Sequence, residues 1–150
     1  MTDLRERIER IEDLEAIRRL KHRYCELCDD HYNADAIAQL FAQDGVWDAG
    51  AGYGRYVGPD AIAAFFRTMP AAVTFSAHMV LNEQIDLLGT TATGRWRAII
   101  PASFRIDGAD VPHWLITGYE DAFRREAGTW RFTLLRSIIH RSFAHLKGWA

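Results

Sequence analysis

The chain has 150 residues, a length that suits one ordinary domain able to bury roughly two-thirds of the surface of its unfolded state. Hydrophobic residues make up 49% of it and charged residues 25%, which excludes a disordered segment. The formal net charge of −2 gives no electrostatic reason to expect nucleic acid or an anionic membrane as a partner, and no segment approaches the ~20 consecutive apolar residues of a membrane span.

The start of the chain and its cysteine content bear on where the protein works. Residues 1–21, MTDLRERIERIEDLEAIRRLK, are densely charged and lack the apolar core of a signal peptide. Two cysteines, Cys25 and Cys28, are too few for a secreted disulfide scaffold. We therefore expect a single cytoplasmic domain that spans residues 1–150.

Apolar residues recur every three or four positions from the start of the chain, which predicts a long amphipathic helix with Arg, Glu and Lys on its opposite face. This stripe consists of Leu4, Ile8, Ile11, Leu14, Ile17, Leu20, Tyr24 and Leu27. Asn33 or Asp35 can cap a second, shorter helix that runs through Phe41 and stops at Gly45. The glycine-rich segment 46–56 predicts a short irregular hairpin.

A third helix and four strands follow. Pro59 suits the first turn of a helix that runs to Pro70. Long runs with strand character then cover residues 75–87, 91–106, 111–124 and 129–143. Their short connections favour an antiparallel meander, and helices followed by a long curved sheet form an α+β pattern.

The predicted strands separate polar from apolar faces. The strand 91–106 alternates best, with one apolar face formed by Trp96, Ala98, Ile100, Ala102 and Phe104. His78 lies inside the strand 75–87 on a polar face with Ser76, Val80, Asn82 and Gln84. A polar face of this kind is typical either of a solvated surface or of the floor of a pocket.

The last strand places basic groups on an apolar face. If no bulge intervenes, Arg136 and His140 share that face with Trp130, Phe132, Leu134 and Ile138. After a slip of one residue, Arg141 would take the inward place instead. Basic groups in such surroundings require a partner or a ligand.

One cluster has metal-ligand residue types at even spacing, namely His22, Cys25, Cys28 and His31. On a helix, steps of three residues spread these side chains over about half of the cylinder, whereas tetrahedral zinc needs ligands that converge. A redox pair would lie at a helix start after a strand, not at a helix end. We therefore expect no metal here and interpret both cysteines as small apolar packing residues.

The end of the first helix carries Asp29 and Asp30, although acidic residues are electrostatically disfavoured at a helix C-terminus. Such a local penalty marks either a functional position or a solvated turn. The sequence contains no GxSxG, Walker, GxGxxG or HExxH motif, which argues against hydrolase-triad, nucleotide, Rossmann and zincin chemistry.

Four segments resemble the SnoaL-like branch of the nuclear-transport-factor-2-like superfamily. They are residues 11–47 (IEDLEAIRRLKHRYCELCDDHYNADAIAQLFAQDGVW), 58–62 (GPDAI), 76–96 (SAHMVLNEQIDLLGTTATGRW) and 118–132 (GYEDAFRREAGTWRF). Within this branch the sequence is similar to the bile-acid 7α-dehydratases and, more distantly, to hexachlorocyclohexane dehydrochlorinases and scytalone dehydratases. The resemblance implies a cone-shaped fold, in which a strongly curved and mostly antiparallel sheet wraps around the N-terminal helices and encloses a deep apolar cavity.

The resemblance also implies roles for particular residues. The family's helix pattern falls on Tyr24 and Asp29, and its strand pattern falls on His78 and Asn82. His78 would be the general base, Asp29 would orient it, and Tyr24 would donate a hydrogen bond to a carbonyl or leaving oxygen. The family's arginine near the end of the sheet matches loosely, so that Arg136, His140 and Arg141 compete for that role.

These implications give a hypothesis and two alternatives. We expect a lyase without cofactors that eliminates water or another group from a small hydrophobic cyclic substrate such as a steroid, terpenoid or aromatic compound. Besides Asn82, the expected substrate-binding residues are the apolar walls Trp47, Phe66, Trp96, Phe104 and Trp114. The alternatives are an isomerase or cyclase that uses the same pair, and a non-catalytic ligand-binding or dioxygenase small-subunit-like module. We also expect a homo-oligomer, either a trimer or a dimer.

Overall fold

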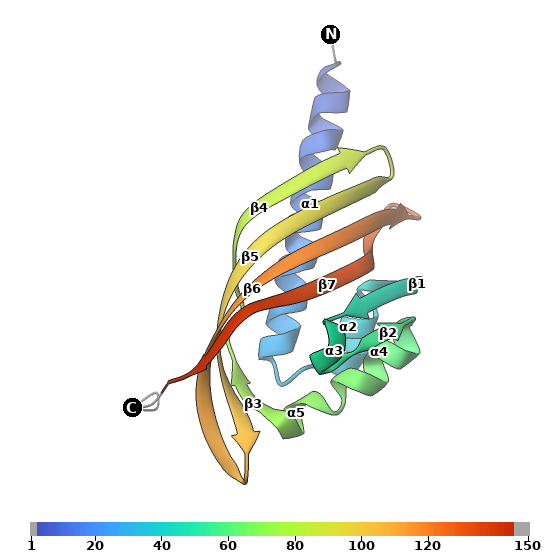
Figure 1. The fold of residues 1–150 in the computed structure, drawn as a ribbon. Helices are drawn as coiled ribbons and strands as arrows, with labels where there is room; N and C mark the ends of the chain where they lie inside the picture. Colours follow the sequence, from blue (N-terminus) through green and yellow to red (C-terminus); the bar gives the residue numbers. More distant parts are fainter. Residues whose placement is uncertain (1–2, 146–150) are drawn as a thin grey trace.

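The computed structural model describes residues 3–145 and places the helices first and a strongly curved sheet after them (Figure 1). The helices are α1 (Leu4–Asp29), α2 (Ala34–Ala38), α3 (Gly50–Tyr53), α4 (Pro59–Phe66) and α5 (Met69–Ala72). The strands are β1 (Phe41–Asp48), β2 (Arg55–Val57), β3 (Val73–Ser76), β4 (Met79–Leu88), β5 (Thr91–Ile106), β6 (Ala109–Glu126) and β7 (Thr129–Ala144). The predicted α+β class is therefore confirmed.

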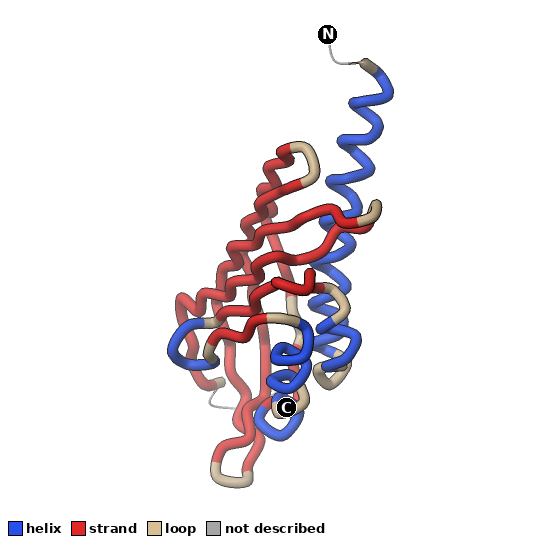
Figure 2. Tube along the Cα trace, turned by 90° about the vertical axis from the view of Figure 1, so that its right-hand side faces the viewer, coloured by secondary structure: helices blue, strands red, loops and turns tan. Residues whose placement is uncertain are grey.

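The sheet is mostly antiparallel, as predicted. Its strand order is β2-β1-β7-β6-β5-β3, and β4 also pairs with β5. The strands β4 to β7 form the expected meander, in which β5 and β6 pair from Thr91 with Arg124 to Ile106 with Ala109. The strand β1, from the first half of the chain, pairs in parallel with the last strand, β7. Figure 2 shows the long strands as one layer with α1 lying against it.

The long helix α1 confirms the predicted stripe but uses its two halves differently. Glu6 accepts a hydrogen bond from the backbone of Asp3 at the helix start, as expected of a cap. The C-terminal half buries Ile17, Leu27 and their neighbours against the sheet. The N-terminal half projects beyond the sheet (Figure 1), and its apolar residues Leu4, Ile8 and Ile11 are exposed.

Two predicted helix ends were wrong. The side chain of Asn33 does cap α2, since it accepts a hydrogen bond from the backbone of Ala36, but the helix ends at Ala38. Phe41 instead begins β1, where it packs on Phe132 with ring centroids 5.3 Å apart. Pro70 does not end α4 but lies in the first turn of α5, a position that proline tolerates because that turn needs no N–H.

The predicted strand 75–87 is in fact two strands. The strand β3 ends at Ser76 and β4 begins at Met79, so His78 lies in the gap between them. A second irregularity follows between Leu81 and Gln84, where Asn82 has a left-handed φ of 54°. His78 and Asn82 therefore do not share the regular polar face that an unbroken strand would give them.

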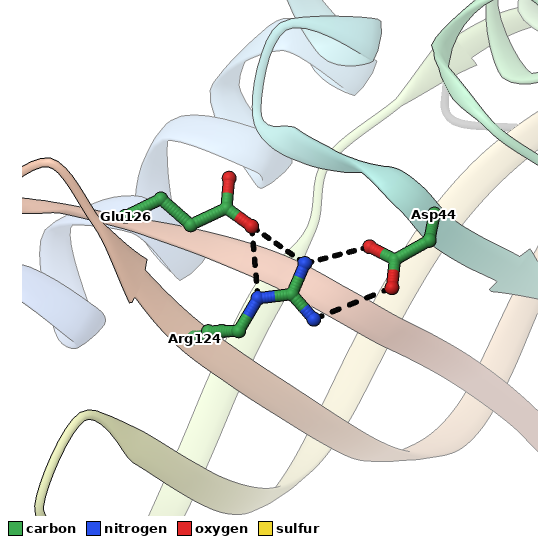
Figure 3. A network of polar contacts seen from close by, with 3 residues as sticks. All are labelled: Asp44, Arg124 and Glu126. Atoms are coloured by element: carbon green, nitrogen blue, oxygen red, sulfur yellow. Dashed lines mark hydrogen bonds and ion pairs between the residues drawn. The ribbon is translucent and has the colours of Figure 1, made fainter.

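A salt-bridge network connects β6 with β1, which lie on either side of β7 in this sheet. Arg124 on β6 reaches past β7 to Asp44 on β1, with nitrogen–oxygen distances of 2.7 and 3.3 Å, and its Nε also contacts Glu126 at 2.8 Å (Figure 3). The hydrogen bonds from Arg124 lower the pKa of Asp44 below its ordinary value. Because these side chains are largely exposed, the network contributes little stability.

None of the helices in residues 3–145 combines the length and the apolar character that crossing a membrane requires.

Candidate active site

Asp29 and His78 are hydrogen-bonded to each other, although 49 residues separate them in the chain. The Asp29 carboxylate accepts a hydrogen bond from His78 Nδ1 at 2.6 Å, from the His78 backbone N–H at 2.8 Å and from the Ser76 hydroxyl at 3.0 Å. Because a carboxylate can only accept, Nδ1 is the donor in this contact, and in the neutral imidazole the lone pair is then on Nε2. Only 9% of the His78 side chain and 31% of the Asp29 side chain are exposed.

Local backbone structure brings this pair together. Asp29 is the last residue of α1, and the chain then turns through His31 and Tyr32 with left-handed φ angles of 50° and 54°. His78 lies in the break between β3 and β4, so its backbone N–H has no strand partner. It donates a hydrogen bond to the Asp29 carboxylate instead. Three hydrogen-bond donors therefore stabilise the negative charge of Asp29, which would otherwise be unfavourable at the C-terminus of a helix.

His78 lines a cavity between the curved sheet and the helices. Its volume is about 80 Å³, measured as the space open to the centre of a water molecule. One buried water needs roughly 10–15 Å³ by the same measure, so the cavity has room for a compact molecule. Its wall is mainly aromatic and aliphatic. Besides His78, the lining includes Tyr24, Tyr32, Trp47, Phe66, Phe104, Thr117, Tyr119, Ser137 and Ile139.

Tyr24 reaches this cavity from the last turns of α1 and is 3% exposed. The indole N–H of Trp47 donates a hydrogen bond of 2.9 Å to its hydroxyl oxygen. Burial raises the pKa of Tyr24 well above its ordinary value, and the nearby Cys28 raises it further. The phenol therefore stays protonated and remains a hydrogen-bond donor.

The expected apolar walls divide into three groups. Trp47, Phe66 and Phe104 line the cavity. Trp96 faces the interior, but its ring lies over Gly94, where a Cβ atom would come within 2.2 Å of the indole, so it fills the core instead. The prediction for Trp114 was wrong, because it pairs with Pro101 and Phe143 on the outer face, opposite to its buried neighbour Leu115.

Comparison with known proteins identifies the family. The model of the SnoaL-like domain matches residues 9–136. The chain belongs to the SnoaL-like family. No curated protein matches it in sequence.

Solved structures show the same fold over nearly the whole chain. A hexachlorocyclohexane dehydrochlorinase, LinA type 2, has a TM-score of 0.85 at 16% identity, with 93% of each chain covered. A proposed aromatic ring hydroxylase from Novosphingobium aromaticivorans has a TM-score of 0.79 at 28% identity, covering 91% of this chain and 95% of its own. A proposed scytalone dehydratase from the same organism has a TM-score of 0.79 at 20% identity, covering 91% and 89%. These likenesses confirm the predicted nuclear-transport-factor-2-like architecture.

The basic residues of β7 do not enter the cavity of this SnoaL-like domain. A bulge at Thr133 reverses the alternation after Phe132, so that Leu135, Ser137 and Ile139 point inward. Arg136 and His140 were expected to share the face of Phe132 only if no bulge intervened. Because this bulge does intervene, they do not share it.

Both residues lie on the outer face of the sheet. Arg136 is 45% exposed there and lies 3.5 Å from Asp48 and 3.7 Å from Glu120. The imidazole of His140 covers Gly118, where a Cβ atom would come within 2.8 Å of Nε2. A second bulge at His140 turns Arg141 outward as well, since Arg141 pairs with the outer residue Ile116.

Asn82 is also absent from the cavity wall. It lines a hollow on the outer face together with Gln84, Arg95 and His140. The bulge that gives Asn82 its left-handed φ carries its side chain away from the face of His78. Its expected role in substrate binding has no geometric support.

The cluster of His22, Cys25, Cys28 and His31 does not converge. The two histidines are exposed, whereas the two cysteines are buried and free. Burial raises the pKa of Cys25 to about 12, so this thiol stays protonated and unreactive. The packing role predicted for the cysteines agrees with their burial.

Several cavity residues escaped the prediction from sequence. Tyr119 and Thr117 come from β6, and Ser137 and Ile139 come from β7 beyond its first bulge. For β6 the inward residues Leu115, Thr117, Tyr119, Asp121 and Phe123 are all buried and follow the two-residue period of a strand, so the strand predicted over residues 111–124 already placed them on one face. For β7 no such signal existed, since a bulge leaves no mark in residue type.

Beneath the cavity, Lys21 and Asp121 form a buried ion pair, with 2.8 Å between Nζ and Oδ2 and no exposure of either side chain. The ammonium group also lies 3.4 Å from the centre of the Tyr119 ring. The pair therefore joins α1 to β6 directly below the tyrosines that line the cavity.

Proposed function

We propose that this SnoaL-like protein is a cofactor-independent lyase in which His78 takes a proton from carbon of a small, hydrophobic, cyclic substrate. The observation that carries the proposal is the hydrogen bond of 2.6 Å between Asp29 and His78 at the wall of an apolar cavity. A general base must hold a free lone pair where the substrate binds, and the Asp29 contact leaves Nε2 of His78 in that state. The dehydrochlorinase with the same fold, although only 16% identical, is consistent with an elimination.

The proposed step conserves atoms and charge. Nε2 of His78 accepts the proton from a substrate carbon, and the electrons of that C–H bond form the new double bond. The leaving group departs from the adjacent carbon with its bonding electron pair. Asp29 stabilises the imidazolium that forms, because its negative charge lies against Nδ1. Tyr24 donates its proton in a hydrogen bond to a carbonyl or leaving oxygen, and no metal or redox cofactor takes part.

Three variants and a set of substrates test this proposal. Purified protein is incubated with hydroxylated monocyclic terpenoids, aromatic dihydrodiols and hydroxysteroids, and products are followed by mass. We expect a product lighter by one water, and we expect His78→Ala and Asp29→Asn each to abolish its formation. Asp30→Asn is the matched control, because Asp30 neighbours Asp29 but lies outside the pair. Full activity of either dyad variant would refute the mechanism.

An isomerase or cyclase is the nearest alternative, since it begins with the same proton abstraction. The mass of the product separates the two, because isomerisation leaves it unchanged. A different alternative is a non-catalytic module that binds a small ligand or serves as the small subunit of a dioxygenase. In that case neither the wild type nor the dyad variants would form a product from any compound of the screen.

The assembly and location of the protein belong to the same proposal. We propose a homo-oligomer, dimer or trimer, because the outer face of the sheet exposes Met79, Leu81, Ile116 and Phe143. Elution as a monomer at micromolar concentration in gel filtration would contradict this. The two buried free thiols suit a reducing compartment such as the cytoplasm.

A further inference from the structure

The hydroxyl group of Thr117 is a buried polar group without a partner. Thr117 is 2% exposed, and its Oγ1 has no hydrogen-bond partner within residues 3–145. Its neighbours across the sheet, Ala98 and Ile139, have apolar side chains that cannot supply one. Burying a hydroxyl without a partner is unfavourable, and native proteins rarely contain such groups.

Thr117 belongs to the wall of the same cavity as His78. On the inner face of β6, Thr117 lies between Leu115 and Tyr119, which line the cavity too. The pairing of Val80 with Ala98 and of Ala98 with Thr117 puts β6 two strands away from the chain that carries His78. Two strand spacings amount to roughly 10 Å, so Thr117 and His78 meet different ends of a bound molecule.

The charges around the cavity restrict what that molecule can be. Within the described chain, the lining contains no Lys, Arg, Asp or Glu side chain. Lys21 lies beneath the wall but is neutralised by Asp121, and a protonated His78 would be neutralised by Asp29. An anionic ligand would therefore be buried without a counter-charge, which is costly.

We propose that Thr117 binds a hydroxyl or carbonyl oxygen of the substrate, and that the cavity selects compact, uncharged, oxygenated ring compounds over hydrocarbons and over anions. This inference rests on the proposed use of the cavity as the active site. The Thr117 hydroxyl both donates and accepts, so it pairs with either kind of oxygen. A ligand oxygen supplies the hydrogen-bond partner that Thr117 lacks in the described chain, so that the new hydrogen bond favours binding.

Three probes of equal ring size test the selectivity, namely phenol, toluene and benzoate. Binding is followed by calorimetry and by tryptophan fluorescence, to which Trp47 in the cavity wall contributes. Wild-type protein is expected to bind phenol more tightly than toluene, and to bind benzoate at pH 7.5 most weakly. Benzoate binding as tightly as phenol, or no phenol binding at millimolar concentration, would overturn the proposal.

Thr117→Val removes the hydroxyl and keeps the shape of the side chain, whereas Thr117→Ser keeps the hydroxyl. We expect the valine variant to lose phenol affinity about tenfold and toluene affinity less than twofold, and the serine variant to retain the preference. Equal loss for both probes, or no loss for phenol, would show that Thr117 does not bind the oxygen.

The stability of the ligand-free variants gives an independent readout. Replacing an unpaired hydroxyl with a methyl group should leave the melting temperature of Thr117→Val equal to that of the wild type or higher. A lower melting temperature would mean that the hydroxyl has a structural partner, against the proposal. Probe binding and turnover are measured separately, so a wild-type protein that prefers phenol to toluene but turns over no substrate would count against the lyase proposal and not against this one.

Discussion

Trp47 holds the phenol of Tyr24 as an acceptor, because its indole nitrogen donates a hydrogen bond of 2.9 Å to the hydroxyl oxygen. The proton of that hydroxyl can then be donated to a ligand oxygen in the cavity that Tyr24 lines. The wall residue Trp47 thereby becomes a positioning residue for the proposed donor.

Trp47→Phe keeps the aromatic packing and removes the hydrogen bond. We expect kcat to fall about tenfold with little change in KM, because the Tyr24 hydroxyl loses its orientation but not its place. The measurement is a double-mutant cycle with Tyr24→Phe on a substrate found in the screen. In the Tyr24→Phe background, Trp47→Phe should have no further effect, and additive losses would contradict this role.

Arg136 and His140 should be dispensable for turnover. Since both side chains lie on the outer face of β7, Arg136→Ala and His140→Ala should retain kcat/KM within about twofold of the wild type. Ile139→Phe is the matched control, because Ile139 lies between them but lines the cavity. That variant should lower kcat/KM about tenfold or more by filling the cavity. A large loss in Arg136→Ala would show that this arginine reaches the substrate.

The same residues show where sequence reasoning succeeds and where it stops. The strand β5 was predicted at its actual ends because Gly89 and Asp107-Gly108 bound it in the sequence, and its pairing with β6 runs from Thr91 to Ile106 without a register shift. The strand β7 was found as well, but its two bulges decide which side chains point inward, and they arise from pairing with β6. A one-residue displacement of this kind changes the face of every later residue without changing the composition.

The candidate site divides in a similar way. Asp29 and His78 were named through the family resemblance, since neither stands out by residue type alone. The break in the strand at His78 was missed because its cause lies 49 residues away, in the Asp29 carboxylate that binds the His78 backbone N–H. The burial of Lys21 was missed for another reason. A lysine next to an apolar stripe is ordinarily assigned to solvent, whereas Lys21 is buried in an ion pair with Asp121.

The turn after α1 should contain removable strain. His31 has a left-handed φ of 50° and is exposed, and an L-residue pays a steric cost there that glycine does not. His31→Gly should therefore raise the free energy of unfolding by up to about 1 kcal/mol, measured by urea denaturation. Asp30→Gly serves as the control, because Asp30 has a φ of −86° and should gain nothing. Equal effects of the two changes would contradict the assignment of strain to His31.

The buried pair of Lys21 and Asp121 should be replaceable as a unit but not in part. Lys21→Met leaves a buried carboxyl group without its cation, and at pH 8 we expect a loss of about 3–5 kcal/mol in the free energy of unfolding. The double variant with Asp121→Leu should recover most of that loss, because apolar side chains of similar volume avoid the desolvation penalty. Arg5→Ala breaks an exposed pair with Glu9 and should cost less than about 1 kcal/mol. A double variant as unstable as Lys21→Met would refute this account.

Asp121 should give the stability of the protein an unusual pH dependence. Burial raises its pKa from 3.8 to about 6, although Lys21 opposes the shift. The folded chain therefore binds this proton more tightly than the unfolded chain does between those two values. By linkage, the contribution of Asp121 to the free energy of unfolding is largest at about pH 4, falls as the pH rises towards 6, and is constant above that range.

Asp121→Asn removes this titration and leaves the other carboxyl groups in place. Asp44 and Glu83 have lowered pKa values, so their contributions run in the opposite direction and are lost as the pH falls. Subtracting the free energy of unfolding of the variant from that of the wild type, at each pH from 4 to 8, cancels them. The difference should fall between pH 4 and 6 and then stay level. A difference that rises with pH would mean that Lys21 outweighs burial and holds the pKa of Asp121 below 3.8.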